Sequence, residues 1–278
     1  MQKTTFPVRI CIFEDASTDR TAEIVKEYAD KYPGLIFAFC QKENTWKKGE
    51  IRRKARNPFN EVRNIAKYIA LCEGDDYWTD PLKLQKQVGF MEKNLNHSMC
   101  FHNVRILDVN NLNRREGLYL HLENRDYSGK EILSKWTVPT ASVLYRTELL
   151  PKMKRIKRHP NIMYGDIFLF LSMAEFGKIR CINEEMGVYR IHSNSITNKD
   201  NSTEHSFRFI KHQKALQQSF GGKYKNLNNE VIARSYLLIS QDFFKERQFL
   251  KSVKYGFLSL YYSPLAILRI IRHKVFNK

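Results

Sequence analysis

The chain has 278 residues, 42% of them hydrophobic and 13% aromatic, enough to bury the core of one large domain, alone or with an appendage. Lys and Arg outnumber Asp and Glu by 47 to 29, which gives a net charge of +18. This excess excludes an acidic solvating chain. It indicates an anionic partner such as a phosphate, a nucleic acid or a lipid surface.

The positive charge is concentrated in three segments. Residues 41–67 carry nine Lys/Arg against three Glu, residues 152–158 carry five Lys/Arg, and residues 245–278 carry eight Lys/Arg against one Glu. No helix-turn-helix, zinc-finger or RNA-binding signature accompanies them, so we expect no nucleic-acid partner.

The cysteines and the N-terminal residues indicate the cellular compartment of the protein. Five single cysteines without a CxxC pair argue against a disulfide framework or zinc site and favour buried free thiols in a reducing environment. The first residues lack the apolar region and cleavage site of a signal peptide, and no run of about 18 apolar residues occurs. We therefore expect a cytoplasmic protein without a membrane-spanning helix.

The N-terminal half alternates between strand and helix patterns. Pro33-Gly34 ends the first helix, Ser17 or Thr18 could cap it, and Pro81 suits the start of the second. The predicted strands cover 8–13, 35–40 and 68–72, and the predicted helices cover 19–32 and 81–94. This alternation predicts an α/β fold with a mostly parallel, Rossmann-like sheet flanked by helices.

The pattern continues and then changes after about residue 200. Further strands are predicted at 98–109, 139–146, 178–183 and 186–191, with a helix at 165–177. Only helices follow, at about 203–220, 228–245, 248–262 and 264–275. We therefore expect an α/β domain over residues 1–200 and a helical region over 201–278.

The strongest motif is Glu73-Gly74-Asp75-Asp76, directly after the strand at 68–72. Carboxylates at the carboxyl end of a strand lie where open α/β sheets bind ligands, and oxygen ligands suit Mg²⁺ or Mn²⁺. The alternative is an acidic turn that caps the next helix.

A second acidic pair, Glu14-Asp15, follows the strand at 8–13. A carboxylate there can accept hydrogen bonds from a nucleotide base or ribose. It could equally belong to the cap of the following helix.

Four segments in order together resemble the bacterial family 2 glycosyltransferases of the GT-A fold. They are ICIFEDASTDRTAEIV, YIALCEGDDYWTDPLKLQKQV, GDIFLFLSMAEFGKI and GVYRIHSNSIT, and they cover roughly residues 8–198. The resemblance implies a GT-A-like sheet with a helical C-terminal extension.

The resemblance also implies a set of site residues. Asp15 matches the aspartate that contacts the nucleotide base, Glu73 and Asp75 match the D-x-D element near ribose and the diphosphate-bound metal, and Asp76 adjoins them at the donor site. Asp166 matches the general base of inverting members, and His192 a histidine that completes the metal or diphosphate site. Alternatively, Asp166 could cap its helix and His192 could hydrogen-bond backbone.

The implied reaction is metal-dependent, inverting transfer of a sugar from a nucleoside-diphosphate donor, UDP-linked by expectation, to a hydroxyl of a glycan or lipid-linked acceptor. The metal would be Mn²⁺ or Mg²⁺, and the pathway the synthesis of a cell-surface polysaccharide. Lys47, Lys48, Arg52 or Arg53 could meet the diphosphate, or belong to a solvated loop.

One departure from the family concerns the N-terminus. Family members begin with another strand and helix before the first motif, whereas Asp15 lies only 14 residues after Met1. We expect this unit to be missing, with weakened nucleotide binding. An inactive, truncated glycosyltransferase-like scaffold is the alternative hypothesis.

The C-terminal tail, residues 255–278, combines apolar and aromatic residues with Arg269, Arg272 and Lys274. Leu265, Leu268, Ile271 and Val275 follow helical spacing. A basic amphipathic helix can lie on an anionic bilayer, so we expect peripheral contact with the inner face of the cytoplasmic membrane. Packing on the catalytic domain is the alternative.

Overall fold

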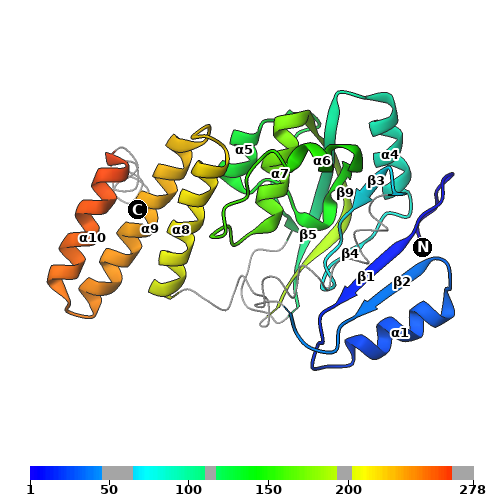
Figure 1. The fold of residues 1–278 in the computed structure, drawn as a ribbon, viewed down its shortest axis with the longest axis horizontal. Coiled ribbons are helices and arrows are strands. Elements are labelled where there is room, and N and C mark those ends of the chain that lie inside the picture. Colours follow the sequence, from blue (N-terminus) through cyan, green and yellow to red (C-terminus); the bar gives the residue numbers. More distant parts are fainter. Residues whose placement is uncertain (46–64, 110–116, 193–201, 265–278) are drawn as a thin grey trace.

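The computed structural model describes residues 1–45, 65–109, 117–192 and 202–264. Its parts follow one another along the long axis of the molecule (Figure 1). A small strand–helix–strand unit lies at one end, the larger sheet with its helices lies in the middle, and three long helices form the other end.

The N-terminal unit consists of β1 (Ile10–Glu14), α1 (Thr21–Lys31) and β2 (Ile36–Cys40). The two strands pair in parallel, with Ile10 opposite Ile36. The expected cap by Ser17 or Thr18 is wrong, because neither side chain bonds the start of the helix. Instead, the Asp19 carboxylate accepts from the Thr21 N–H at 2.9 Å.

The larger sheet has the strand order β3-β8-β5-β9-β4, with β6 on β5 and β7 on β9. Its strands are β3 (Tyr68–Ala70), β4 (Tyr77–Trp78), β5 (His97–Asp108), β6 (Gly117–Leu118), β7 (Asp126–Tyr127), β8 (Leu144–Arg146) and β9 (Lys178–Ile191). β9 is one long strand where the sequence suggested two, and residues 140–142 form a 3-10 turn before β8.

The α/β class, with a central sheet flanked by helices, is confirmed, but the expectation of a mostly parallel sheet is wrong here. Among the described strands of this sheet, the β5–β9 pair is parallel and the other pairs are antiparallel. Apolar periodicity identifies a strand but says nothing of its direction relative to a distant partner.

The sheet has a core on each face. Along β5, Met99 and Phe101 join the main core, whereas Cys100 between them packs with Leu84 and Met91 of α4 (Lys83–Lys93). The alternation follows from the two-residue period of a strand. On the main-core face lie α5 (Gly129–Lys135), α6 (Leu150–Met153) and α7 (Gly165–Phe176).

Gly177 joins α7 to β9 where the chain passes very close to the start of β5. A Cβ at this position would lie 2.8 Å from the Ser98 backbone nitrogen and 2.9 Å from the Asn96 carbonyl oxygen. Gly177→Ala is therefore expected to lower the free energy of unfolding by about 2 kcal/mol, because backbone must move. Gly89→Ala, in the interior of α4 with nothing within 4 Å, is the matched control and should stabilise slightly. Urea unfolding of both variants checks this, and equal stability of the two would contradict it.

The predicted helices after residue 200 are confirmed as α8 (Thr203–Ser219), α9 (Lys225–Lys245) and α10 (Phe249–Tyr262). Leu216 of α8 and Tyr224 join the main core, while Ile232 and Ile239 of α9 belong to a separate cluster.

The predicted helix at 264–275 lies outside the described residues. The helices within the described ranges do not combine the length and apolar character needed to cross a bilayer. The division at about residue 200 stays a prediction.

His212 of α8 is fully buried beside Tyr164, and its Nδ1 accepts from the Met163 N–H at 3.3 Å. Burial and the charge of Arg158 lower its pKa from 6.5 to about 4. The unfolded chain therefore binds the proton more readily, and stability must fall as pH falls from 6.5 to 4, by on the order of 3 kcal/mol for this group.

His212→Asn should flatten this part of the stability–pH profile, because an amide oxygen can accept from Met163 without titrating. The exposed His121→Asn is the control and should leave the profile unchanged. Thermal unfolding midpoints at pH 4, 5, 6 and 7 test the prediction; parallel profiles for the two variants would refute it.

Candidate active site

The Glu73–Asp76 loop connects β3 to β4 and lies beside the end of β9. β4 pairs antiparallel with β9, with Tyr77 opposite Val188 and Trp78 opposite Gly187. This pairing places the residues just before Tyr77 next to those just after Val188. Two distant segments, the acidic loop and the Arg190–His192 segment, are thereby joined.

Hydrogen bonds connect the acidic loop to the Arg190–His192 segment. The Arg190 backbone N–H donates to Asp76 Oδ1 at 2.9 Å, and the Arg190 Nε–H donates to the Asp75 carbonyl oxygen. His192 Nε2 lies 3.2 Å from Asp75 Oδ2. Asp75 and His192, the two metal ligands implied by the resemblance, are thus direct neighbours.

The loop concentrates negative charge. Burial, and the neighbouring charge of Asp75, raise the pKa of Asp76 to about 6 against the lowering effect of the Arg190 N–H. Partial desolvation raises the pKa of Glu73 to about 7, with further contributions from the charges of Asp76, Asp75 and Asp166. Asp76 Oδ2 is buried, and no described residue forms a hydrogen bond with it. A cation near these carboxylates would relieve their repulsion.

The Asp75–His192 pair fits a divalent ion. The separation of 3.2 Å between their ligand atoms is close to the roughly 3 Å between neighbouring ligands of an octahedral ion with bonds of about 2.1 Å. Within the described ranges, no three His, Cys, Asp or Glu side chains converge as a metal-binding group. Mg²⁺ and Mn²⁺ commonly bind one or two protein carboxylates together with substrate phosphates, and Asp75 supplies one such carboxylate.

Asp166 lies in the first turn of α7, near Glu73 of the acidic loop. Its Oδ1 accepts from the Ile167 N–H at 2.8 Å, and its Oδ2 accepts from the Thr140 hydroxyl at 3.4 Å. Tyr164 occupies the N-cap position of α7. The alternative prediction, in which Asp166 is the N-cap residue, is therefore wrong. The carboxylate is half-buried and close enough to Glu73 to act on its pKa.

The first acidic pair belongs to the other sheet. Glu14 is buried and accepts from the N–H groups of Ala16 and Ser17, at 3.1 and 2.6 Å, which shapes the turn after β1. Asp15 Oδ1 accepts from the N–H and hydroxyl of Thr45, at 2.9 and 2.6 Å. Among the described residues, the hydrogen bonds of Asp15 do not reach the 73–76 loop. Lys47, Lys48, Arg52 and Arg53 lie outside the described residues.

A buried lysine, Lys83 of α4, packs against Trp78, which follows the acidic loop in β4. Lys83 is fully buried, its Nζ lies 3.7 Å from the centre of the Trp78 ring, and burial lowers its pKa to about 7. The Trp78 indole N–H donates to the Ala141 carbonyl oxygen at 2.7 Å. Trp78 is thus held on two sides while it pairs with Gly187, which fixes the register of the acidic loop against β9.

Sequence reasoning missed Lys83 and Tyr119 as parts of this environment. Burial is the main cause that raises the pKa of Tyr119 to about 12, and the negative charges of Asp166 and Glu73 add to it. The tyrosine hydroxyl donates to the Trp136 carbonyl oxygen at 3.0 Å. Lys83 sits in a helix that reads as amphipathic and solvated, and no motif surrounds Tyr119, so neither carried a usable signal.

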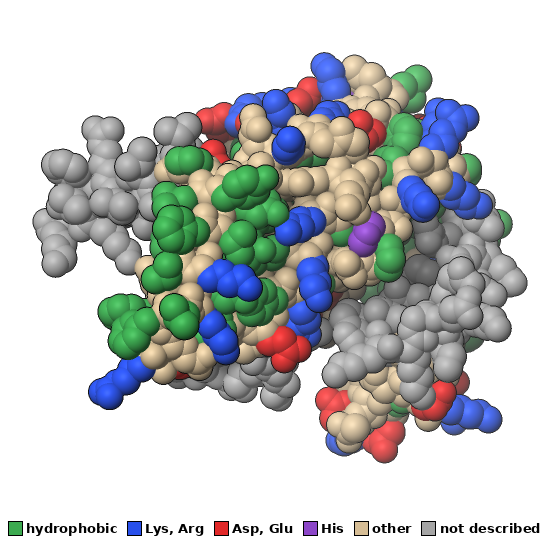
Figure 2. Space-filling model, turned by 60° about the vertical axis from the view of Figure 1, so that its left-hand side comes forward, with side chains coloured by type: hydrophobic (Ala, Val, Ile, Leu, Met, Phe, Trp, Pro, Cys, Tyr) green, Lys and Arg blue, Asp and Glu red, His purple; other side chains and the backbone are tan. Residues whose placement is uncertain are grey.

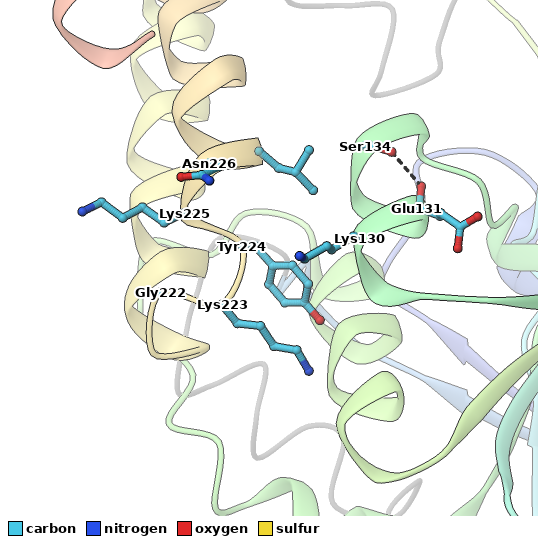
Figure 3. Close-up of a pocket in the computed structure, with 9 residues that line it drawn as sticks. Lys130, Glu131, Ser134, Gly222, Lys223, Tyr224, Lys225 and Asn226 are labelled. Atoms are coloured by element: carbon cyan, nitrogen blue, oxygen red, sulfur yellow. Dashed lines mark hydrogen bonds between the residues drawn. The ribbon is translucent and has the colours of Figure 1, made fainter.

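A separate cavity of about 550 Å³ lies between α5 and the start of α9 (Figure 3). Lys130 and Glu131 line it from α5, and Lys223 and Tyr224 from the turn before α9. None of the acidic-loop residues lines it. The cavity is therefore distinct from the candidate active site.

Comparisons with known proteins agree with the motifs. The sequence model described as Glycosyl transferase family 2 matches residues 1–153. Protein Rv1520 of Mycobacterium tuberculosis is 38% identical over 197 residues, which are 70% of this chain and 53% of that protein. The glycosyltransferase MJ1057 of Methanocaldococcus jannaschii is 28% identical over 195 residues, 69% of this chain and 61% of its own. The chain spans about half the length of the first of these relatives.

Among solved structures, the mannosyltransferase PcManGT from Pyrobaculum calidifontis, in complex with GDP-Man and Mn²⁺, aligns with a TM-score of 0.48 and 11% identity. The alignment covers 99% of this chain and 81% of that one. The family assignment does not need it, because the family match alone spans more than half of the 278 residues. The chain belongs to glycosyl transferase family 2.

Proposed function

We propose that the chain transfers a sugar from a nucleoside-diphosphate sugar to an acceptor hydroxyl, with the help of Mn²⁺ or Mg²⁺ and with inversion at the anomeric carbon. The observation that carries this proposal is the arrangement of the acidic loop. Asp75 and His192 lie 3.2 Å apart, and Asp166 is close enough to Glu73 for its charge to raise the pKa of Glu73. In this proposal Asp75 and His192 serve the donor diphosphate, and Asp166 serves the acceptor hydroxyl.

Each residue has a distinct task in the reaction. Asp166 accepts the proton of the acceptor hydroxyl as its oxygen forms a bond to the anomeric carbon. The bond between that carbon and the diphosphate oxygen breaks, and the nucleoside diphosphate leaves with the electron pair. A single displacement of this kind inverts the configuration.

Asp75 and His192 would hold the divalent ion, which supplies stabilisation of the charge that develops on the leaving diphosphate. Glu73 and Asp15 would contact the nucleoside. Asp76, whose Oδ1 receives the Arg190 N–H, would adjoin the donor and hold the end of β9 at the site.

The proposal also names the nucleotide, the acceptor and the location in the cell. We take UDP as the nucleotide, and a glycan or lipid-linked glycan of cell-surface polysaccharide synthesis as the acceptor. The setting is the cytoplasm, with peripheral contact at the inner face of the membrane. The basic C-terminal tail supports that contact through its sequence, and its residues 265–278 lie outside the described ones.

Thermal unfolding with UDP, with Mn²⁺ and with both tests the proposal. A ligand at a hundredfold excess over its Kd stabilises by about 2.7 kcal/mol, which corresponds here to a rise of about 5 °C in the midpoint. We expect this rise only when nucleotide and metal are present together. A folded sample that shows no shift with UDP, GDP and other nucleoside diphosphates, with either metal, would refute the proposal.

A further inference from the structure

Helix α10 presents its large apolar side chains to solvent. Leu250 is 90% exposed, Tyr261 80%, Phe257 67% and Val253 57%. The spacing of three, four and four residues places them on one face of the helix. Figure 2 shows the C-terminal helices with hydrophobic side chains gathered on this side of the molecule and Lys or Arg beside them.

The same helix uses its small residues for packing. The Ser240 hydroxyl donates to the Ser252 carbonyl oxygen at 2.8 Å, and the Ser259 hydroxyl donates to the Ala233 carbonyl oxygen at 2.6 Å. A Cβ at Gly256 would lie 3.5 Å from Ser240 Oγ. α10 therefore packs on α9 through these small residues together with Tyr255, Leu258 and Tyr262. Leu250, Val253, Phe257 and Tyr261 do not belong to that cluster.

The charged side chains of α10 itself are all positive. α10 contains no Asp or Glu, and its charged residues are Lys251 and Lys254. Their ammonium groups lie 5.1 and 5.7 Å from the rings of Phe243 and Tyr255. Lys251 follows Leu250 and Lys254 follows Val253 in the helix, so both lysines lie beside the apolar face.

We propose that the outer face of α10, formed by Leu250, Val253, Phe257 and Tyr261 with Lys251 and Lys254 at its edge, docks on the surface of an anionic bilayer. Apolar side chains would enter the boundary between headgroups and acyl chains, and the lysines would meet anionic headgroups. Two copies of the face would bring four lysines together, which repel, whereas an anionic bilayer offsets them. The inference deepens the membrane contact proposed above and does not depend on glycosyl transfer.

Sedimentation of the full chain with vesicles tests this inference. Vesicles of phosphatidylcholine with about 30% phosphatidylglycerol should bind the protein, and phosphatidylcholine alone should bind it at least about tenfold more weakly. The double variant L250S/F257S should lose at least about tenfold in affinity, because it removes two apolar side chains from the contact. Leu95→Ser, at a site 77% exposed between α4 and β5, is the matched control and should bind as the unchanged protein does.

Reversing the charge of the two lysines provides a second test of vesicle binding. K251E/K254E should weaken binding to anionic vesicles by at least about tenfold at low salt and much less at high salt. Unchanged binding by L250S/F257S would assign the contact to another part of the chain and overturn the proposal. A dimer in solution that L250S/F257S dissociates, without vesicle binding, would make a second copy the occupant and overturn it as well. Loss of transfer with vesicle binding intact would bear on the proposed reaction alone.

Discussion

Replacing Asp166 by asparagine is expected to lower kcat by about a hundredfold to ten-thousandfold, the usual contribution of a positioned general base. The asparagine oxygen can still accept from the Ile167 N–H, so the start of α7 should keep its geometry. The loss should therefore appear in kcat, and the Kd for nucleotide with Mn²⁺ should change less than about threefold.

Glu131→Gln is the matched control for this prediction. Glu131 is also an acidic residue in the first turn of a helix, where it forms a capping box with Ser128, and it lies on α5 away from the acidic loop. Its replacement should leave kcat unchanged. Transfer by the Asp166→Asn variant at the full rate would remove Asp166 from the role of base.

Asp75→Asn is expected to raise the Kd for nucleotide in the presence of Mn²⁺ by at least about a hundredfold. Loss of a residue that merely supports a metal ligand costs tenfold to a hundredfold, and loss of the ligand itself should cost more. In the absence of ligand, the variant should be no less stable than the original chain, because the change removes one of the repelling carboxylates that raise the pKa of Glu73. Isothermal titration with and without Mn²⁺ measures the first effect, and thermal unfolding measures the second.

Asp80→Asn serves as the control for Asp75. Asp80 lies two residues after β4, and its carboxylate is held by Lys86 and by the Leu82 N–H rather than by the acidic loop. Nucleotide binding should remain intact in this variant. Equal losses in both variants would mean that Asp75 acts through general charge and not as a metal ligand.

The parts of the site that depend on local sequence could be predicted. The acidic loop follows an apolar strand within a few residues, and Asp166 begins a helix whose apolar pattern is plain. The family resemblance then gave these residues their expected roles. Backbone and side-chain preferences over such short spans are strong enough to read directly.

The parts that depend on distant pairing could not be predicted. The contact between Arg190 and the acidic loop needs β4 to pair with β9, more than 100 residues later in the chain. The same limitation explains why the strands were identified while their mostly antiparallel pairing was not. The burial of Lys83 against the Trp78 ring could not be predicted, because no local sequence pattern indicates that contact.

Helix α10 shows a further limit of periodicity. A stripe of large apolar residues normally predicts the buried face of a helix. Here Ser252, Gly256 and Ser259 take the inner face, and Leu250 and Phe257 face outward. Only the packing of α10 on α9 reveals which of the two faces is exposed.

Release of nucleoside diphosphate from a panel of UDP- and GDP-linked sugars, measured with Mn²⁺ and with a chelator, tests the central claim most directly. The account predicts release from at least one donor, abolished by the chelator and by Asp75→Asn. Release that persists at the same rate in the chelator and in Asp75→Asn would contradict a metal held by Asp75 and His192. No release from any donor by a folded protein would contradict glycosyl transfer and favour the inactive scaffold.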